Sequence, residues 1–113
     1  MELILHGDYL ALGSDVYVYC ERRLRFAMFR FRDDVARISV HIRPGDEPDG
    51  MLCRMLANTI DGRRIAIEQG GAHAYEAVDV ATRLLAQALE RETRGFTRDG
   101  LAPDDRGGAP PSA

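Results

Sequence analysis

The chain has 113 residues, 45% of them hydrophobic, and a formal net charge of −3. This length and composition fit one globular domain with a single core and exclude a polycationic chain. No run approaches the roughly 20 apolar residues of a membrane-spanning helix, and no signal-peptide pattern opens the chain, so we expect a cytoplasmic protein without a membrane partner.

All 15 cationic side chains are arginines, and their distribution is uneven. The segment Glu21–Arg32 holds five arginines against one glutamate, a local excess of +4. Arginine is better suited than lysine to bidentate phosphate contacts and to stacking. Any contact with nucleic acid should therefore centre on this segment.

A strand and a long helix are predicted at the start of the chain. The apolar run from Met1 to His6 is short enough for a strand. Ser14 or Asp15 can then accept hydrogen bonds from the free N–H groups of a first helical turn. The helix should end between positions 32 and 35, because the consecutive aspartates at 33 and 34 oppose its C-terminal dipole.

The helix from Ser14 to Val35 has an apolar stripe and an unusual opposite face. The core-facing stripe, at helical spacing, consists of Val16, Tyr17, Cys20, Leu24, Ala27, Met28, Phe31 and Val35. The opposite side carries Val18, Arg22, Arg25, Phe26 and Phe29. Arginines interleaved with aromatic side chains predict a face that binds a partner.

Three strands are predicted to follow as an antiparallel meander. Residues 36–43 alternate between apolar and polar, and the turn-rich segment 44–50 reverses the chain into a strand over 51–60. Asp61 and Gly62 are a two-residue hairpin signal before a strand over 63–68. The solvent face of this sheet would carry a mixed set of charges, from Arg37, His41, Arg43, Arg64 and Glu68.

A second amphipathic helix is predicted from His73 to Arg94, after Gly70 and Gly71 break the last strand and before Gly95 ends the helix. Residues 96–113 are rich in proline and glycine, so we expect a domain over 1–95 and a flexible tail over 96–113. The element order β-α-β-β-β-α predicts the α+β class, a four-stranded sheet with two roughly parallel helices packed on one face.

No constellation of residues points to catalysis. The histidines at positions 6, 41 and 73 lie on different predicted elements, and no nucleophile elbow accompanies them. The acidic loop over 46–49 does not match an EF-hand, and Cys20 and Cys53 lack metal-ligand spacing and are expected to be buried thiols. We therefore expect a protein that is not an enzyme and has no metal or cofactor.

The element order and four segments resemble a known family. The segments are Tyr19–Leu24, Phe31 seven residues after it, Arg37–Ile42 and Ala74–Asp79. Together, over about residues 1–95, they resemble the ribosome hibernation-promoting factors, also called ribosome-associated inhibitors or ribosomal subunit interface proteins. The resemblance implies a divergent short bacterial member that binds the small ribosomal subunit in the channel of messenger and transfer RNA. Such proteins hold idle ribosomes inactive under stress or in stationary phase.

The resemblance also implies a set of residues that bind ribosomal RNA. Arg22 and Arg23 match a basic pair of the family, and Arg91 keeps a basic position of its second helix. Nearby arginines supply charge where other basic positions are lost. The implied RNA-binding residues are Arg22, Arg23, Arg25, Arg30, Arg83 and Arg91.

Two other interpretations of the first helix remain open. In one, the same fold is a protein-interaction module, and Val18, Phe26 and Phe29 form the centre of a homodimeric or heterodimeric contact with an arginine rim. In the other, the arginines are merely solvated and the two phenylalanines pack under a loop or the tail.

Overall fold

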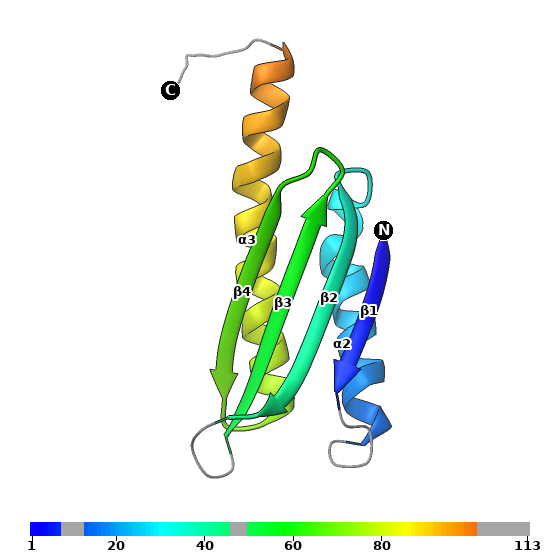
Figure 1. Ribbon diagram of the computed structural model, residues 1–113, viewed down its shortest axis with the longest axis vertical. Coiled ribbons are helices and arrows are strands. Elements are labelled where there is room, and N and C mark those ends of the chain that lie inside the picture. Colours follow the sequence, from blue (N-terminus) through cyan, green and yellow to red (C-terminus); the bar gives the residue numbers. More distant parts are fainter. Residues whose placement is uncertain (8–12, 46–49, 102–113) are drawn as a thin grey trace.

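A computed structural model describes residues 1–7, 13–45 and 50–101, with the side chains of residues 93–101 excepted (Figure 1). Its elements are β1 (Glu2–Gly7), α2 (Ser14–Met28), the 3₁₀ turn η1 (Phe29–Phe31), β2 (Val35–Pro44), β3 (Met51–Thr59), β4 (Arg64–Gly71) and α3 (Ala74–Leu101). The predicted α+β class and element order are confirmed. Neither helix of the described chain is long and apolar enough to cross a membrane.

The four strands form one sheet in the order β1-β2-β3-β4. β1 pairs with β2 in parallel, and the other two pairings are antiparallel. A parallel pair needs a crossover connection, which α2 supplies. Both helices cover the same face of the sheet and run side by side in the same direction (Figure 1). The opposite face, called here the outer sheet face, carries no helix of the described part of the chain.

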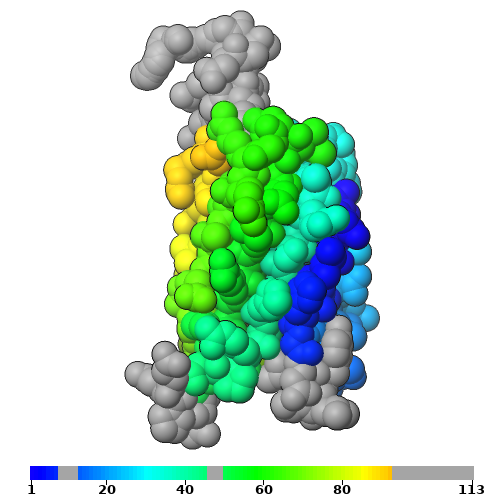
Figure 2. Space-filling model, in the orientation of Figure 1, coloured from blue at the N-terminus to red at the C-terminus, as the bar shows by residue number. Residues whose placement is uncertain are grey.

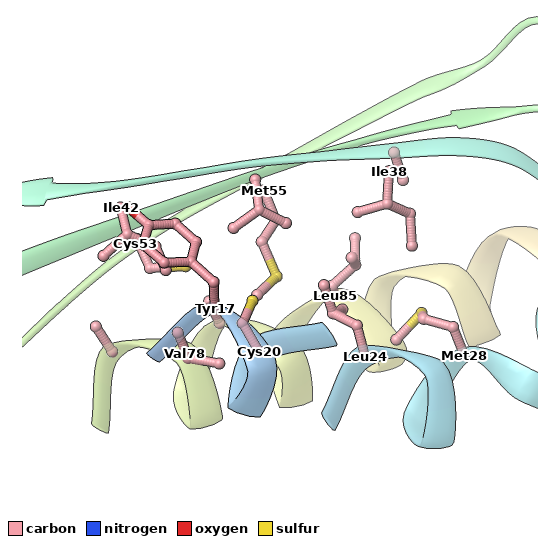
Figure 3. Packing of buried hydrophobic residues seen from close by; sticks show 14 of the residues in the cluster. Tyr17, Cys20, Leu24, Met28, Ile38, Ile42, Cys53, Met55, Val78 and Leu85 are labelled. Atoms are coloured by element: carbon pink, nitrogen blue, oxygen red, sulfur yellow. The ribbon is translucent and has the colours of Figure 1, made fainter. Parts of the chain in front are cut away.

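The core lies between the sheet and the two helices (Figure 3). Side chains from α2, such as Leu24 and Met28, point toward Ile38 and Met55 of the sheet, and Leu85 of α3 completes the layer. All five are fully buried. Each such burial stabilises the fold by about 1.5–3 kcal/mol. The predicted alternation of β2 is confirmed over residues 38–43, since Ile38, Val40 and Ile42 are buried and the residues between them are not.

The two cysteines are buried, free thiols, as predicted. Burial raises the pKa of Cys20 to about 12, and the neighbouring Glu21 carboxylate contributes to this shift. Burial likewise raises the pKa of Cys53 to about 12. Both thiols therefore stay protonated at neutral pH and act as small apolar core side chains.

The first helix is shorter than predicted, because α2 ends at Met28 and Val35 belongs to β2. Its last turn tightens into η1, where the Arg32 N–H donates to the Phe29 carbonyl at 3.2 Å and the Asp34 N–H donates to the Phe31 carbonyl at 2.9 Å. These bonds satisfy carbonyl groups that an ended helix leaves open. The helix begins at Ser14 as predicted, but the predicted cap by Ser14 or Asp15 is wrong, since Gly13 occupies the cap position and no side-chain hydrogen bond caps the helix.

The connection between β3 and β4 is longer than the predicted two-residue hairpin. The ladder ends at Asn58 and Arg64, and the chain turns over residues 60–63. Thr59 holds this turn, because its hydroxyl donates to Asp61 Oδ1 at 2.5 Å and accepts from the Arg63 N–H at 2.8 Å. The side chain of Thr59 therefore competes with the tight hairpin that the sequence of the turn favours.

Two element ends predicted from glycines are wrong. Gly70 and Gly71 belong to β4, and Gly95 lies inside α3, which continues to Leu101. A helical glycine costs about 1 kcal/mol relative to alanine and does not by itself end a helix. Residues 102–113 lie outside the described residues, so the division into a domain over 1–95 and a flexible tail over 96–113 stays a prediction.

Gly71→Ala should destabilise the fold, whereas Gly70→Ala should be nearly neutral. A Cβ at position 71 would lie 2.8 Å from the backbone nitrogen of Ala77, where α3 begins. A Cβ at position 70 would come no closer than 3.7 Å to another atom. We expect a loss of about 1–3 kcal/mol for Gly71→Ala, measured by urea denaturation followed by circular dichroism. Equal stabilities of the two variants would contradict this account of the β4–α3 junction.

Candidate nucleic-acid interface

The six arginines predicted to bind RNA all lie on α2, η1 and α3, on the side of the sheet that the helices cover. We call the solvent-facing side of these elements the helix face. Five of the six are exposed, and Arg23 is half-buried. The structure thus brings them onto one layer of the molecule, as the sequence predicts for two neighbouring helices.

A polar cluster joins α2 to α3 within this layer. The Tyr19 hydroxyl donates to Asp79 Oδ1 at 2.5 Å, and Arg23 Nε lies 3.3 Å from the same oxygen. The Tyr19 ring meets the Tyr75 ring edge to face, with centroids 5.0 Å apart. The hydrogen bond to Asp79, followed by burial, raises the pKa of Tyr19. Arg23 therefore serves first as a contact between the helices.

Carboxylates offset part of the positive charge on the helix face. Besides Arg23, two more of the six arginines are ion-paired: Arg25 with Glu21 at 3.2 Å, and Arg30 with Glu90 at 4.0 Å. The sequence shows a local excess of +4, but α3 places acidic side chains beside it. Exposed pairs of this kind contribute only about 0–1 kcal/mol each, so a phosphate group can displace the carboxylate.

The remaining three predicted arginines are differently placed. Arg22, Arg83 and Arg91 are exposed, and among the residues the structure describes none of them forms an ion pair. They are the arginines most available to an anionic partner. Arg22 stands out because it also matches the basic pair implied by the family resemblance.

The apolar side chains of the helix face are open to solvent. Val18 is 47% exposed, Phe26 84% and Phe29 63%. No described loop therefore covers the two phenylalanines, and a contact with the predicted tail falls outside the described residues. Arg32 lies over the Phe29 ring, with its Cζ 4.0 Å from the ring centroid, which is a cation–π contact.

Sequence reasoning missed the acidic residues that face α2. Asp79 and Glu90 lie about three turns apart on α3, so helical spacing alone places them on one side of that helix. That signal was present in the sequence. The sequence does not show, however, which side of α3 packs beside α2. Residues on either flank of the apolar stripe could face that helix.

The described residues contain no group of three histidine, cysteine, aspartate or glutamate side chains placed to hold a metal ion. The helix face instead offers hydrogen-bond donors, positive charge and flat aromatic surfaces. These groups recognise phosphates and unpaired bases.

Asp79→Asn should lower the pKa of Tyr19, because the hydrogen bond to the Asp79 carboxylate is the main cause of its raised value. The change can be measured by following the Tyr19 ring signals by NMR as a function of pH. Glu90→Gln is the matched control, since it neutralises the other α3 carboxylate that pairs with an arginine of the first helical segment. A pKa of Tyr19 that responds equally to both variants would refute the assignment.

No protein-family model and no curated protein matches this sequence. Solved structures share its fold, including the following two. A ribosomal subunit interface protein from Coxiella burnetii is 15% identical, with a TM-score of 0.69 over 83% of this chain and 99% of that one. The N-terminal domain of Protein Y from Thermus thermophilus is 21% identical, with a TM-score of 0.62 over 80% of this chain and 93% of that one. The protein therefore has the fold of the ribosomal subunit interface proteins.

Proposed function

We propose that this protein is a divergent hibernation factor that binds the ribosome through its helix face. The observation that carries the proposal is the fold likeness to the Coxiella burnetii ribosomal subunit interface protein, which extends over 99% of that chain. The likeness agrees with the resemblance that the sequence segments carry independently. A binding protein of this kind needs no cofactor and catalyses no reaction.

The chemistry of the helix face supports a partner made of structured RNA. Arg22 and Arg83 are exposed, and their guanidinium groups can pair with two phosphate oxygens at once. The exposed rings of Phe26 and Phe29 can stack on bases that are not paired. The proposed partner is the ribosomal RNA of the small subunit, and the proposed location is its RNA channel.

Occupation of that channel would exclude messenger and transfer RNA, and so would keep idle ribosomes inactive under stress or in stationary phase. The carboxylates on α3 temper the affinity, because a phosphate must compete with Asp79 or Glu90 for Arg23 or Arg30. We therefore propose that binding depends most on the arginines that make no ion pair within the described part of the chain.

Ribosome binding should weaken when Arg22 and Arg83 are both replaced by glutamine. Each lost phosphate contact should also reduce the slope of log affinity against log salt by about 1. The measurement is co-sedimentation of the purified protein with ribosomes over a series of salt concentrations. Arg64→Gln is the matched control, because Arg64 is an exposed arginine of β4. An unchanged slope in the Arg22 and Arg83 variant would contradict the proposed interface.

A second candidate function is favoured by the exposure of Phe26, which is 84% accessible to solvent. Large exposed apolar side chains with a polar rim are typical of protein interfaces. In this proposal α2 and η1 form a homodimeric or heterodimeric contact through Val18, Phe26 and Phe29, with the arginines at its rim.

Replacing Phe26 and Phe29 by alanine should weaken such a contact by about 2 kcal/mol or more, whereas Arg22→Gln should mainly slow association. Sedimentation equilibrium of the purified protein over a wide concentration range measures the homodimer directly. A wild-type protein that stays monomeric, and whose ribosome binding depends on salt as described above, would exclude the homodimer and favour RNA as the partner.

A further inference from the structure

A pocket of about 310 Å³ opens on the outer sheet face, on the opposite side of the sheet from the helices. Figure 2 shows this face, which runs from β1 in blue to β4 in green. All four strands contribute to the pocket, through His6, His41, Arg43, Arg54, Leu56 and Glu68. Its volume lies at the lower end of the range of about 300–1,000 Å³ that is usual for small-molecule sites.

The strand register builds the pocket from one row of side chains across the sheet. His6 is paired with His41, His41 with Arg54, and Arg54 with Glu68. The His6 and His41 rings are stacked, with their centroids 4.3 Å apart and an angle of 10° between the planes. Arg43 lies two residues after His41 and so projects from the same face of β2.

The positive charge in the pocket has no ion-pair partner among the residues that the structure describes. Neither Arg43 nor Arg54 forms an ion pair with any residue that the structure describes, although Glu68 is the register partner of Arg54. Elsewhere on this face Arg37 is paired with Glu2 at 3.0 Å. Glu68 lines the same cavity but forms no ion pair with either arginine, so both guanidinium groups can offer charge-assisted hydrogen bonds to a compact anion.

The electrostatics at His41 agree with this arrangement. The pKa of His41 is lowered by partial burial and by its positive neighbours His6 and Arg54. Arg43 from its own strand and Glu68 from β4 also line the pocket. A bound anion would offset the neighbouring positive charge and favour the protonated imidazole, so ligand binding and protonation of His41 should be coupled.

We propose that the outer sheet face binds a phosphomonoester of about the size of a nucleoside monophosphate, with Arg43 and Arg54 holding its phosphate group. The site is separate from the helix face and does not rest on the proposed ribosome binding. A single small ligand fits better than a nucleic-acid strand, because a strand needs a track of successive cations. Here Glu68 ends the row on β4, and Arg37 is already paired.

The test is an NMR titration of the full chain with AMP, following the ring signals of His6 and His41. We expect saturable shifts of both rings and a higher pKa of His41 in the presence of AMP. Inorganic phosphate should bind at the same place more weakly, and adenosine should not bind. No shift with AMP at millimolar concentration, or equal shifts with AMP and adenosine, would overturn the proposal.

Single substitutions in the pocket test which side chains hold the phosphate group of AMP. Arg54→Gln and Arg43→Gln should each weaken AMP binding by about tenfold, the effect of losing one charge-assisted hydrogen bond. Glu68→Gln should strengthen it, because the repelling carboxylate is removed. Arg64→Gln removes the same charge from β4 outside the pocket lining and should leave affinity unchanged.

Circular dichroism checks that each variant is folded. Equal effects of Arg54→Gln and Arg64→Gln would show only a general influence of net charge and would refute the site. A short single-stranded RNA that binds this face much more tightly than AMP would overturn the assignment to a small ligand.

Discussion

The packing of two helices on one side of a single sheet is the constraint on which the rest of the structure depends. Leu24 and Met28 of α2 and Leu85 of α3 are fully buried against the strands. Once these side chains are inside, helical geometry leaves no choice for the opposite side of α2, which must carry its arginines and phenylalanines outward. The same burial fixes which side of each strand meets the helices. A shift of one residue in register would exchange the two faces of the sheet.

Contacts between the helices determine how much charge the helix face retains. Asp79 binds both Tyr19 and Arg23, so one carboxylate joins the helices and offsets an arginine. Glu90 repeats the ion pairing farther along α3, with Arg30 as its partner. The result is a face with mixed charge, on which the few arginines without an ion pair to a described residue are more informative than the local arginine count. This makes salt dependence a sharper probe of the interface than affinity alone.

The two faces of the molecule offer different chemistry, and the core separates them. The helix face carries mixed charge and exposed aromatic rings, which suits a large, structured partner. The outer sheet face has a small pocket lined by a histidine pair and by two arginines that form no ion pair with a described residue. Because the two sites use different residues on opposite layers, a variant of one should leave the other unaltered.

The sequence by itself determined the features that depend on local periodicity. The alternation in Ile38, Val40 and Ile42 predicted the buried face of β2, and helical spacing predicted most of the buried stripe of α2. The element order and the α+β class followed from the same patterns. The exposed arginines and phenylalanines of α2 and η1 could be named for the same reason, since one helical segment has only one side to bury.

Only the tertiary structure decided where elements end and which distant side chains meet. Val35 has an apolar side chain that suits either the helix or the strand, and its place in β2 depends on pairing with Thr59. The contact of Arg23 with Asp79 requires that one particular side of α3 pack beside α2. The pocket requires His6 and Glu68 to occupy the same row of the sheet. Periodicity is a property of neighbouring residues, whereas register and helix packing join residues far apart in the chain, so no local pattern could specify them.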